Sequence, residues 1–173
     1  HGEYRRQRQM CIRDSINEDF LNYSRKDTCF DKIVSWLALY HIPYRKKYTE
    51  KLFNLLNKKG MLFIEDLTFG SGFESSHKEM LEKKLFANSL EKYSDYLDTC
   101  ANVGFEIVEH KDMSSDWESF TKERLKLLQT NRKKHEKIHG VDGYITIEDF
   151  YKTAAKCFAE NIIGGIRLVC MKN

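Results

Sequence analysis

Two histidines one helical turn apart, His135 and His139, enclose Glu136 in the pattern H-E-x-x-H. On a helix the two imidazoles would share a face and could bind zinc, with the glutamate as the general base of a metalloprotease. Glu160 would be a distant third ligand. The surroundings argue against this chemistry, because the preceding N-R-K-K stretch is cationic, Gly140 ends the helix at once and no third histidine follows at short spacing. We therefore predict no metal site.

A glycine-rich segment and a basic run offer two further chemistries, and we favour neither. Gly70-Ser71-Gly72 follows a predicted strand and could open a dinucleotide fingerprint, but Ser75 stands where the third glycine is needed. The basic run 132–137 is typical of a solvated helix face. The 29 Lys and Arg against 26 Asp and Glu leave a net charge of +3, so bulk charge supports neither a nucleic-acid nor a membrane partner.

Composition indicates one ordinary domain. The 173 residues are 41% hydrophobic and 13% aromatic, which is enough for a sizeable core. The 5 cysteines are scattered without a C-x-x-C pair, which favours free and mostly buried thiols in a reducing compartment. No apolar run approaches the roughly 18 residues of a membrane span, and no signal peptide is visible, so we expect a cytoplasmic protein. The oligomeric state is left open.

The first residues form a segment that we set apart from the fold. The chain begins with His1 rather than Met, and residues 4–15 are charged, aperiodic and similar to adaptor-derived runs in conceptual translations. We expect residues 1–15 to be a non-native or disordered leader. Residues 16–173 would then form one domain of a truncated product.

Hydrophobic spacing along the next part of the chain predicts a strand, a helix and a strand. A nearly continuous apolar run within 30–41 predicts a strand buried on both faces, and 61–67 predicts a second. Between them, apolar positions over 44–59 are spaced for one helix face, with two lysines in the last turn and Gly60 as its stop. Such a βαβ unit has parallel strands.

The remaining chain is predicted to be mostly helical, with two more strands. After a Gly/Ser-rich loop, we expect helices over residues 77–87, 89–102, 116–138 and 147–160. Asp116 and Thr146 stand where the N-caps of the last two helices belong, and a turn at 140–143 separates these helices. Strands are expected at 105–113, solvated on one face, and at 166–171. The fold class is therefore α/β.

This order of elements resembles the C-terminal part of class I S-adenosylmethionine-dependent methyltransferases. Residues 30–35 (FDKIVS) stand at the family's fourth strand, and L-N-K-K-G-M-L-F-I-E-D, ending at Asp66, resembles the family's L-x-P-G-G-x-L-x-x-x-D at the fifth. Residues 103–108 (VGFEIV) are similar to the start of the sixth strand, and 165–169 (GIRLV) to the antiparallel seventh. The resemblance covers about residues 16–173 and implies a partial Rossmann-like sheet, strands four to seven, with a helical lid.

The resemblance implies S-adenosyl-L-methionine as cofactor and assigns its contacts residue by residue. The family's glycine-rich G-x-G-x-G loop is absent from this sequence, and we expect it upstream together with the acid that binds the ribose. Asp19 stands at the acid that accepts from the adenine amino group, and Phe20 would pack on the adenine face. Ser35 and Trp36 fall at the carboxyl end of strand four, beside the ligand crevice of such sheets. An ordinary loop acid and a core tryptophan are the alternatives.

The segment that begins at Ser35, S-W-L-A-L-Y-H-I, is similar to the S-R-D-x-I-x-H-I of phosphoethanolamine methyltransferases. His41 falls on their catalytic histidine, and a histidine suits this role because an amine must be neutral to attack a methyl group. A structural histidine at a strand end is the alternative. Leu37 replaces the amine-binding Asp of those enzymes, which turns the expected acceptor from phosphobases toward amino-acid amines.

The expected function is methyl transfer to a small amine such as sarcosine or dimethylglycine. Arg124 or Arg167 would pair with the acceptor's carboxylate, although either could be a surface or core-edge arginine. Phosphoethanolamine methyl transfer and a non-catalytic α/β binding module are the alternatives. Because the cofactor loop is missing and strand four would expose a free edge, we expect the 173-residue fragment to be inactive alone and prone to aggregate.

Overall fold

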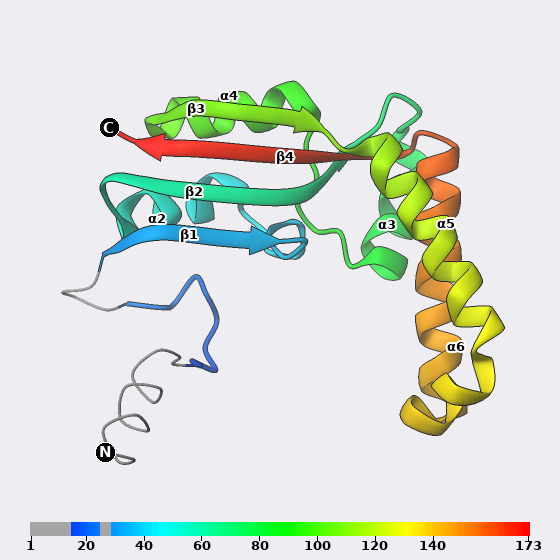
Figure 1. Cartoon of the computed structure of the whole chain (residues 1–173). Coiled ribbons are helices and arrows are strands. Elements are labelled where there is room, and N and C mark those ends of the chain that lie inside the picture. The colour runs from blue at the N-terminus through cyan, green and yellow to red at the C-terminus, as the bar shows by residue number, and fades with distance from the viewer. Residues whose placement is uncertain (1–14, 25–28) are drawn as a thin grey trace, which may run out of the picture.

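A mixed sheet with helices on one face and at one end organises the chain (Figure 1). The computed structural model describes residues 15–24 and 29–173, so nearly all of the predicted leader lies outside the described residues. The strands are β1 (Phe30–Trp36), β2 (Leu56–Phe69), β3 (Phe105–Asp112) and β4 (Ile163–Lys172). The helices are α2 (Arg45–Leu55), α3 (Lys78–Leu85), α4 (Tyr93–Val103), α5 (Ser114–Thr130) and α6 (Arg132–Ala159), with short 3-10 turns η1 (Leu39–His41) and η2 (Ser75–His77).

The sheet has the strand order β1-β2-β4-β3. β1 and β2 are parallel and joined through α2, so the predicted βαβ unit is confirmed. β4 runs antiparallel to both β2 and β3, which confirms the predicted antiparallel last strand. This arrangement brings the carboxyl ends of β1 and β2 to the same edge of the sheet, where α3, α5 and α6 gather (Figure 1).

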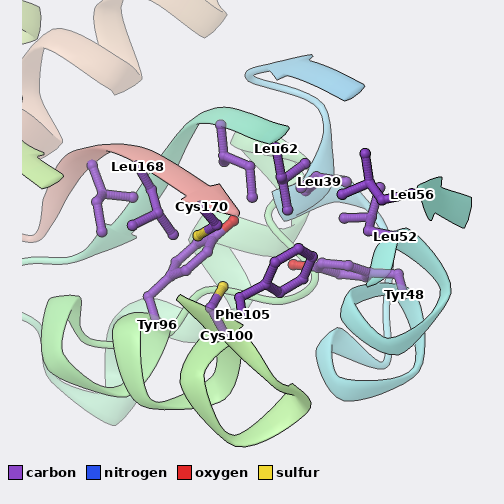
Figure 2. Close-up of a cluster of buried hydrophobic side chains, with 12 residues drawn as sticks. Leu39, Tyr48, Leu52, Leu56, Leu62, Tyr96, Cys100, Phe105, Leu168 and Cys170 are labelled. Carbon is purple, nitrogen blue, oxygen red and sulfur yellow. The ribbon is translucent and has the colours of Figure 1, made fainter. Parts of the chain in front are cut away.

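The main core lies between one face of the sheet and the pair α2 and α4 (Figure 2). Alternate residues of β2 and β4 point into it, because side chains along a strand alternate between faces. Leu62 and Leu168 are fully buried there, and Tyr48 of α2 and Tyr96 of α4 cover them. The core holds α2 and α4 against the sheet and thereby fixes the loops at its carboxyl edge.

The helix predicted over 44–59 ends earlier, at Leu55, and this part of the prediction is wrong. Leu56 is buried and pairs with Phe30, so β2 begins there rather than at Met61. The lysine expected in the last helical turn, Lys59, takes a left-handed φ of 62° within an irregular start of β2. Burial of Leu56 against the sheet outweighs the helical spacing of the preceding residues.

Three predicted helix starts also differ from the structure. α4 begins at Tyr93 rather than 89, because the amides of Asn88 and Ser89 donate to the Tyr40 carbonyl instead of to a helix. α5 begins at Ser114, whose N–H donates to Asp112, so Asp116 lies in the first turn and is not the N-cap. Thr146 lies inside α6, where its hydroxyl donates to the Asp142 carbonyl. The predicted break near 140 is real but is a single kink, at Gly140 with φ of 74°.

The described cysteines are free thiols, as predicted. Cys100 and Cys170 face each other in the main core (Figure 2), and Cys157 is buried under α3. Burial raises the pKa of the Cys157 thiol to about 11, so this thiol is neutral and inert. None of the helices in the described part is long and apolar enough to cross a membrane.

Candidate active site

A partly open chamber lies where the carboxyl ends of β1 and β2 meet α5 and α6. Its volume is about 450 Å³, within the range of small-molecule sites. The wall is mainly aromatic, with rings from Tyr40, Trp117, Phe120, Phe150, Tyr151 and Phe158. The two helices close the edge of the sheet, as the predicted helical lid requires (Figure 1).

Two carboxylates are the charged groups of the chamber wall. Glu65 of β2 accepts from Arg167 of β4 across the sheet, with Oε1 2.8 Å from Nε and 2.6 Å from Nη2. Asp116 of α5 pairs with Lys111 of β3 at 2.7 Å. Neither cation is itself among the residues that line the chamber, and no lysine, arginine or histidine of the described part lines it.

His41 sits in η1, beyond the carboxyl end of β1. Its Nδ1 lies 2.9 Å from the Phe86 carbonyl oxygen. A carbonyl can only accept, so Nδ1 carries a hydrogen, and Nε2 is the ring nitrogen left to accept a proton. The imidazole also lies against the Tyr40 ring, with centroids 3.8 Å apart. His41 does not line the chamber, but its neighbour Tyr40 does.

A buried carboxylate, Asp66, holds these elements together. Its Oδ1 accepts the backbone N–H of Tyr40 at 3.1 Å, and its Oδ2 accepts the Tyr96 hydroxyl at 3.0 Å. Arg45, at the start of α2, lies 3.8 Å from Oδ2 and 3.3 Å from the carboxylate of Glu91. The same guanidinium donates to the Ser89 carbonyl and lies 4.0 Å from the Tyr96 ring centroid. One acid thus links β2, η1, α2 and α4.

Burial perturbs the titration of this cluster. Burial raises the pKa of Asp66 to about 6, although Arg45, the Tyr96 hydroxyl and backbone N–H groups all act to lower it. The pKa of Tyr40 is raised to about 12, first by burial and then by the negative charge of Asp66. The Tyr40 phenol is therefore neutral at ordinary pH, and Asp66 is ionised only above about pH 6.

The predicted cofactor residues fall in two separate places. Ser35 and Trp36 end β1 at the edge that carries the chamber, and the Trp36 ring is 69% exposed beside Phe63. Asp19 and Phe20 lie instead near the start of β1, where Phe20 shares a surface pocket with Phe30 and approaches Lys51 of α2. The structure does not bring these two pairs together, and their cofactor contacts stay predictions. The residues present fit one side of a nucleotide-like cofactor, through an exposed aromatic ring at the ligand-binding edge.

Neither of the two predicted substrate arginines lines the chamber, and their role in acceptor binding stays a prediction. Arg167 donates to Glu65, as described, and Arg124 lies on the outside of α5 over the Phe120 ring, 5.3 Å from its centroid. In the H-E-x-x-H segment, His135 and His139 stack 6.0 Å apart on α6. The described residues contain no group of three or more His, Cys, Asp or Glu side chains that could hold a metal ion.

No protein-family model matches this chain. Phosphoethanolamine N-methyltransferase of Plasmodium falciparum is 25% identical over 143 residues, which cover 80% of this chain and 53% of the relative. The chain therefore spans about half the length of the curated relative that it matches.

Solved structures show the same fold. A candidate sarcosine dimethylglycine methyltransferase from Galdieria sulphuraria superposes with a TM-score of 0.81 at 13% identity, over 99% of this chain and 64% of the other. The fold is that of class I S-adenosylmethionine-dependent methyltransferases. Phosphoethanolamine N-methyltransferase 2 of Haemonchus contortus, in complex with S-adenosylhomocysteine and phosphomonomethylethanolamine, gives 0.77 at 17% identity, over 89% of this chain and 36% of the other. A Mycobacterium tuberculosis cyclopropane synthase gives 0.76 at 14% identity, over 96% and 65%.

Within this methyltransferase fold, sequence reasoning missed three residues of the site. Glu65 and Asp66 enter the sequence analysis only as the end of a strand motif, and Arg45 does not enter it. The signal for Asp66 was present, because an acid that ends an apolar strand must find partners when it is buried. The burial of Arg45 had no local signal, since it opens the charged run R-K-K.

Proposed function

We propose that this chain is part of an S-adenosylmethionine-dependent methyltransferase that acts on an amine. The observation that carries the proposal is the position of His41. An imidazole whose Nδ1 is held by a backbone carbonyl stands at the carboxyl edge of a methyltransferase-type sheet, beside a chamber of acceptor size. The fold likeness to enzymes solved with S-adenosylmethionine or its product supports the cofactor.

S-adenosylmethionine, contacted by Ser35 and Trp36, would supply an electrophilic methyl group for direct transfer to the amine nitrogen. The protein has to orient the amine, exclude water and take up the proton that the amine releases. Nε2 of His41 is the atom that accepts this proton, because Nδ1 already donates to the Phe86 carbonyl. The rings of α5 and α6 exclude water from the chamber. We assign the cofactor contacts at this edge to Trp36 and Ser35.

Methyl transfer to an amine is compatible with more than one acceptor. Leu37 in place of the amine-binding acid favours an amino-acid amine such as sarcosine or dimethylglycine over phosphoethanolamine. The 25% identity with a phosphoethanolamine enzyme favours the alternative. A non-catalytic binding module of the same fold is the third candidate, and it predicts acceptor binding without turnover.

The first experiment titrates S-adenosylmethionine into the full-length gene product by calorimetry. Binding supports the methyltransferase, and a full-length protein that does not bind the cofactor refutes it. We expect the 173-residue chain alone to bind weakly, because its sequence has no G-x-G-x-G loop.

The second experiment replaces the proposed base. His41→Asn is expected to lower the rate of amine methylation by about 10²–10⁴-fold, the usual contribution of a general base, with cofactor affinity unchanged. His139→Asn is the matched control, since His139 is exposed on α6. Equal rates in the two variants would show that His41 has no catalytic role.

A further inference from the structure

The wall of the chamber combines a large apolar surface with negative charge, and binding of sarcosine or phosphoethanolamine does not require this combination. We infer that the methyl acceptor is an amphipathic amine, in which the nitrogen is attached to an apolar chain or ring system without a phosphate or carboxylate. The inference rests on the proposed methyltransferase function and names its substrate class. It is carried by the apolar wall and by the sign of the charges in it.

The inner end of the chamber is apolar. Leu67 and Ile163 come from the strands, and Phe158 of α6 meets Trp117 of α5 edge to face, with centroids 6.4 Å apart. The hydroxyl of Thr121, also in the wall, donates to the Trp117 carbonyl at 2.8 Å and so is not free to donate to a ligand. A volume of about 450 Å³ holds roughly 15 water-sized groups at about 30 Å³ each. A two-carbon amine would leave most of this apolar surface unfilled.

Among the described residues, the charged groups of the wall are all negative. Glu65 and Asp116 line the chamber, and their cations, Arg167 and Lys111, do not. Arg167 contacts Oε1 of Glu65 with both nitrogens, so Oε2 stays free of that arginine and can accept from an ammonium group. A phosphate or carboxylate in the chamber would meet these acids without a lining cation, and burial of an unpaired anion is costly. The amine end of the acceptor therefore belongs at the part of the wall formed by Glu65 and by Tyr40, whose ring lies against His41, and its apolar end belongs near Phe158.

The test measures the binding of primary n-alkylamines, from propylamine to decylamine, to the full-length protein by calorimetry. Affinity is expected to rise about fourfold for each added methylene until the chamber is full. Sarcosine, phosphoethanolamine and decanoate are expected to bind at least tenfold more weakly than decylamine. An affinity that does not depend on chain length, or tighter binding of any of these three compounds than of decylamine, overturns the inference.

Two variants that each introduce a positive charge, one in the chamber wall and one outside it, test whether the amine binds in the chamber. Phe120→Arg places a cation in the wall at a half-exposed position, 49% exposed, where the fold should tolerate it. This variant should bind decylamine at least tenfold more weakly and gain affinity for decanoate. Leu127→Arg makes the same kind of change two turns along α5, at 45% exposure and outside the chamber, and should bind like the parent. Equal effects of the two variants refute binding in the chamber.

The outcomes separate this inference from the proposed function. The full-length protein could bind amines with a chain-length-dependent affinity and yet fail to bind S-adenosylmethionine. That result would support an apolar amine-binding chamber but refute the methyltransferase, so the bound amine would not be a methyl acceptor. Cofactor binding with methylation of sarcosine or phosphoethanolamine, and not of hexylamine, would retain the methyltransferase and refute the amphipathic acceptor.

Discussion

Replacing Tyr96 by phenylalanine isolates a hydrogen bond on which buried Asp66 depends. The change deletes the hydroxyl that lies 3.0 Å from Asp66 Oδ2 and keeps the ring against the Arg45 guanidinium. Asp66 retains the Tyr40 N–H, whereas Arg45 at 3.8 Å is too far for a hydrogen bond. A hydrogen bond to a charged group stabilises a protein by about 1.5–3 kcal/mol, so we expect Tyr96→Phe to lower the free energy of unfolding by about 2 kcal/mol at pH 8.

The pH dependence of that loss is the sharper part of the prediction. The pKa of Asp66 is raised from an ordinary value of 3.8 to about 6 in the folded protein. Between these values the folded state keeps a proton that the unfolded chain has released, so this group makes stability fall as the pH rises from about 4 to about 6. Loss of the Tyr96 donor raises the pKa of Asp66 further, because the hydroxyl favours the charged form. At pH 4, where Asp66 is protonated, the loss should shrink to the roughly 1 kcal/mol of a neutral hydrogen bond.

Urea unfolding followed by circular dichroism measures both values. With a urea dependence of about 2 kcal/mol per M, a loss of 2 kcal/mol lowers the midpoint by about 1 M. Tyr93→Phe on the same helix is the control, because its hydroxyl contacts the surface residue His110 at 2.8 Å and should cost less than about 1 kcal/mol. The reasoning fails if Tyr96→Phe costs no more than Tyr93→Phe at pH 8, or if its cost is the same at pH 4 as at pH 8.

Three other substitutions test the packing of the fold. Gly165→Ala would place a Cβ 2.4 Å from the Trp117 ring, so we expect overpacking to cost about 1–3 kcal/mol in urea unfolding, and a neutral result would contradict the contact. The Cβ of Gly140→Ala would meet no atom within 4 Å, but the residue must adopt φ of 74°. We therefore expect a loss of about 1–3 kcal/mol in the free energy of unfolding that comes from the backbone alone. Gly140→Asn should recover no more than a few tenths of a kcal/mol of that loss. Val34→Lys, at a position of the edge strand β1 that is 51% exposed, should reduce self-association in light scattering without lowering the unfolding midpoint.

Local patterns predicted those parts of the fold that local forces decide. The helix predicted over 89–102 ends within one residue of its predicted end, at Val103, and Gly104 follows it with φ of 113°. The alternation after it predicted β3, whose outer residues are exposed. The segment 86–92 could not be predicted in the same way, because its amides bond to Tyr40 and its Glu91 carbonyl accepts from Phe69. Those partners are distant in sequence, and they replace the helical bonds that the local spacing favours.

The candidate site likewise contains residues whose positions follow from local sequence and residues whose positions do not. Ser35, Trp36 and His41 could be placed at the carboxyl end of β1 because a strand fixes where its last residues lie. The chamber could not be foreseen, since its aromatic rings come from η1, α5 and α6 and their spacing is equally typical of core positions. The carboxylates Glu65 and Asp116 belong to the chamber only because α5 packs back over the edge of the sheet.

A buried acid with a raised pKa is a destabilising group, and its position explains why the fold contains one. Asp66 accepts the Tyr40 N–H, and the Tyr40 carbonyl in turn accepts the amides of Asn88 and Ser89. These bonds fix η1 between β2 and the 86–92 segment, so the Tyr40 ring lines the chamber while the Phe86 carbonyl reaches His41 Nδ1. An apolar residue at position 66 would remove the desolvation cost and would also leave the Tyr40 N–H without its partner. Asp66 therefore lowers the stability of the fold but fixes the shape of the chamber and the tautomer of His41. Substitutions in its hydrogen-bond network should alter acceptor binding as well as stability.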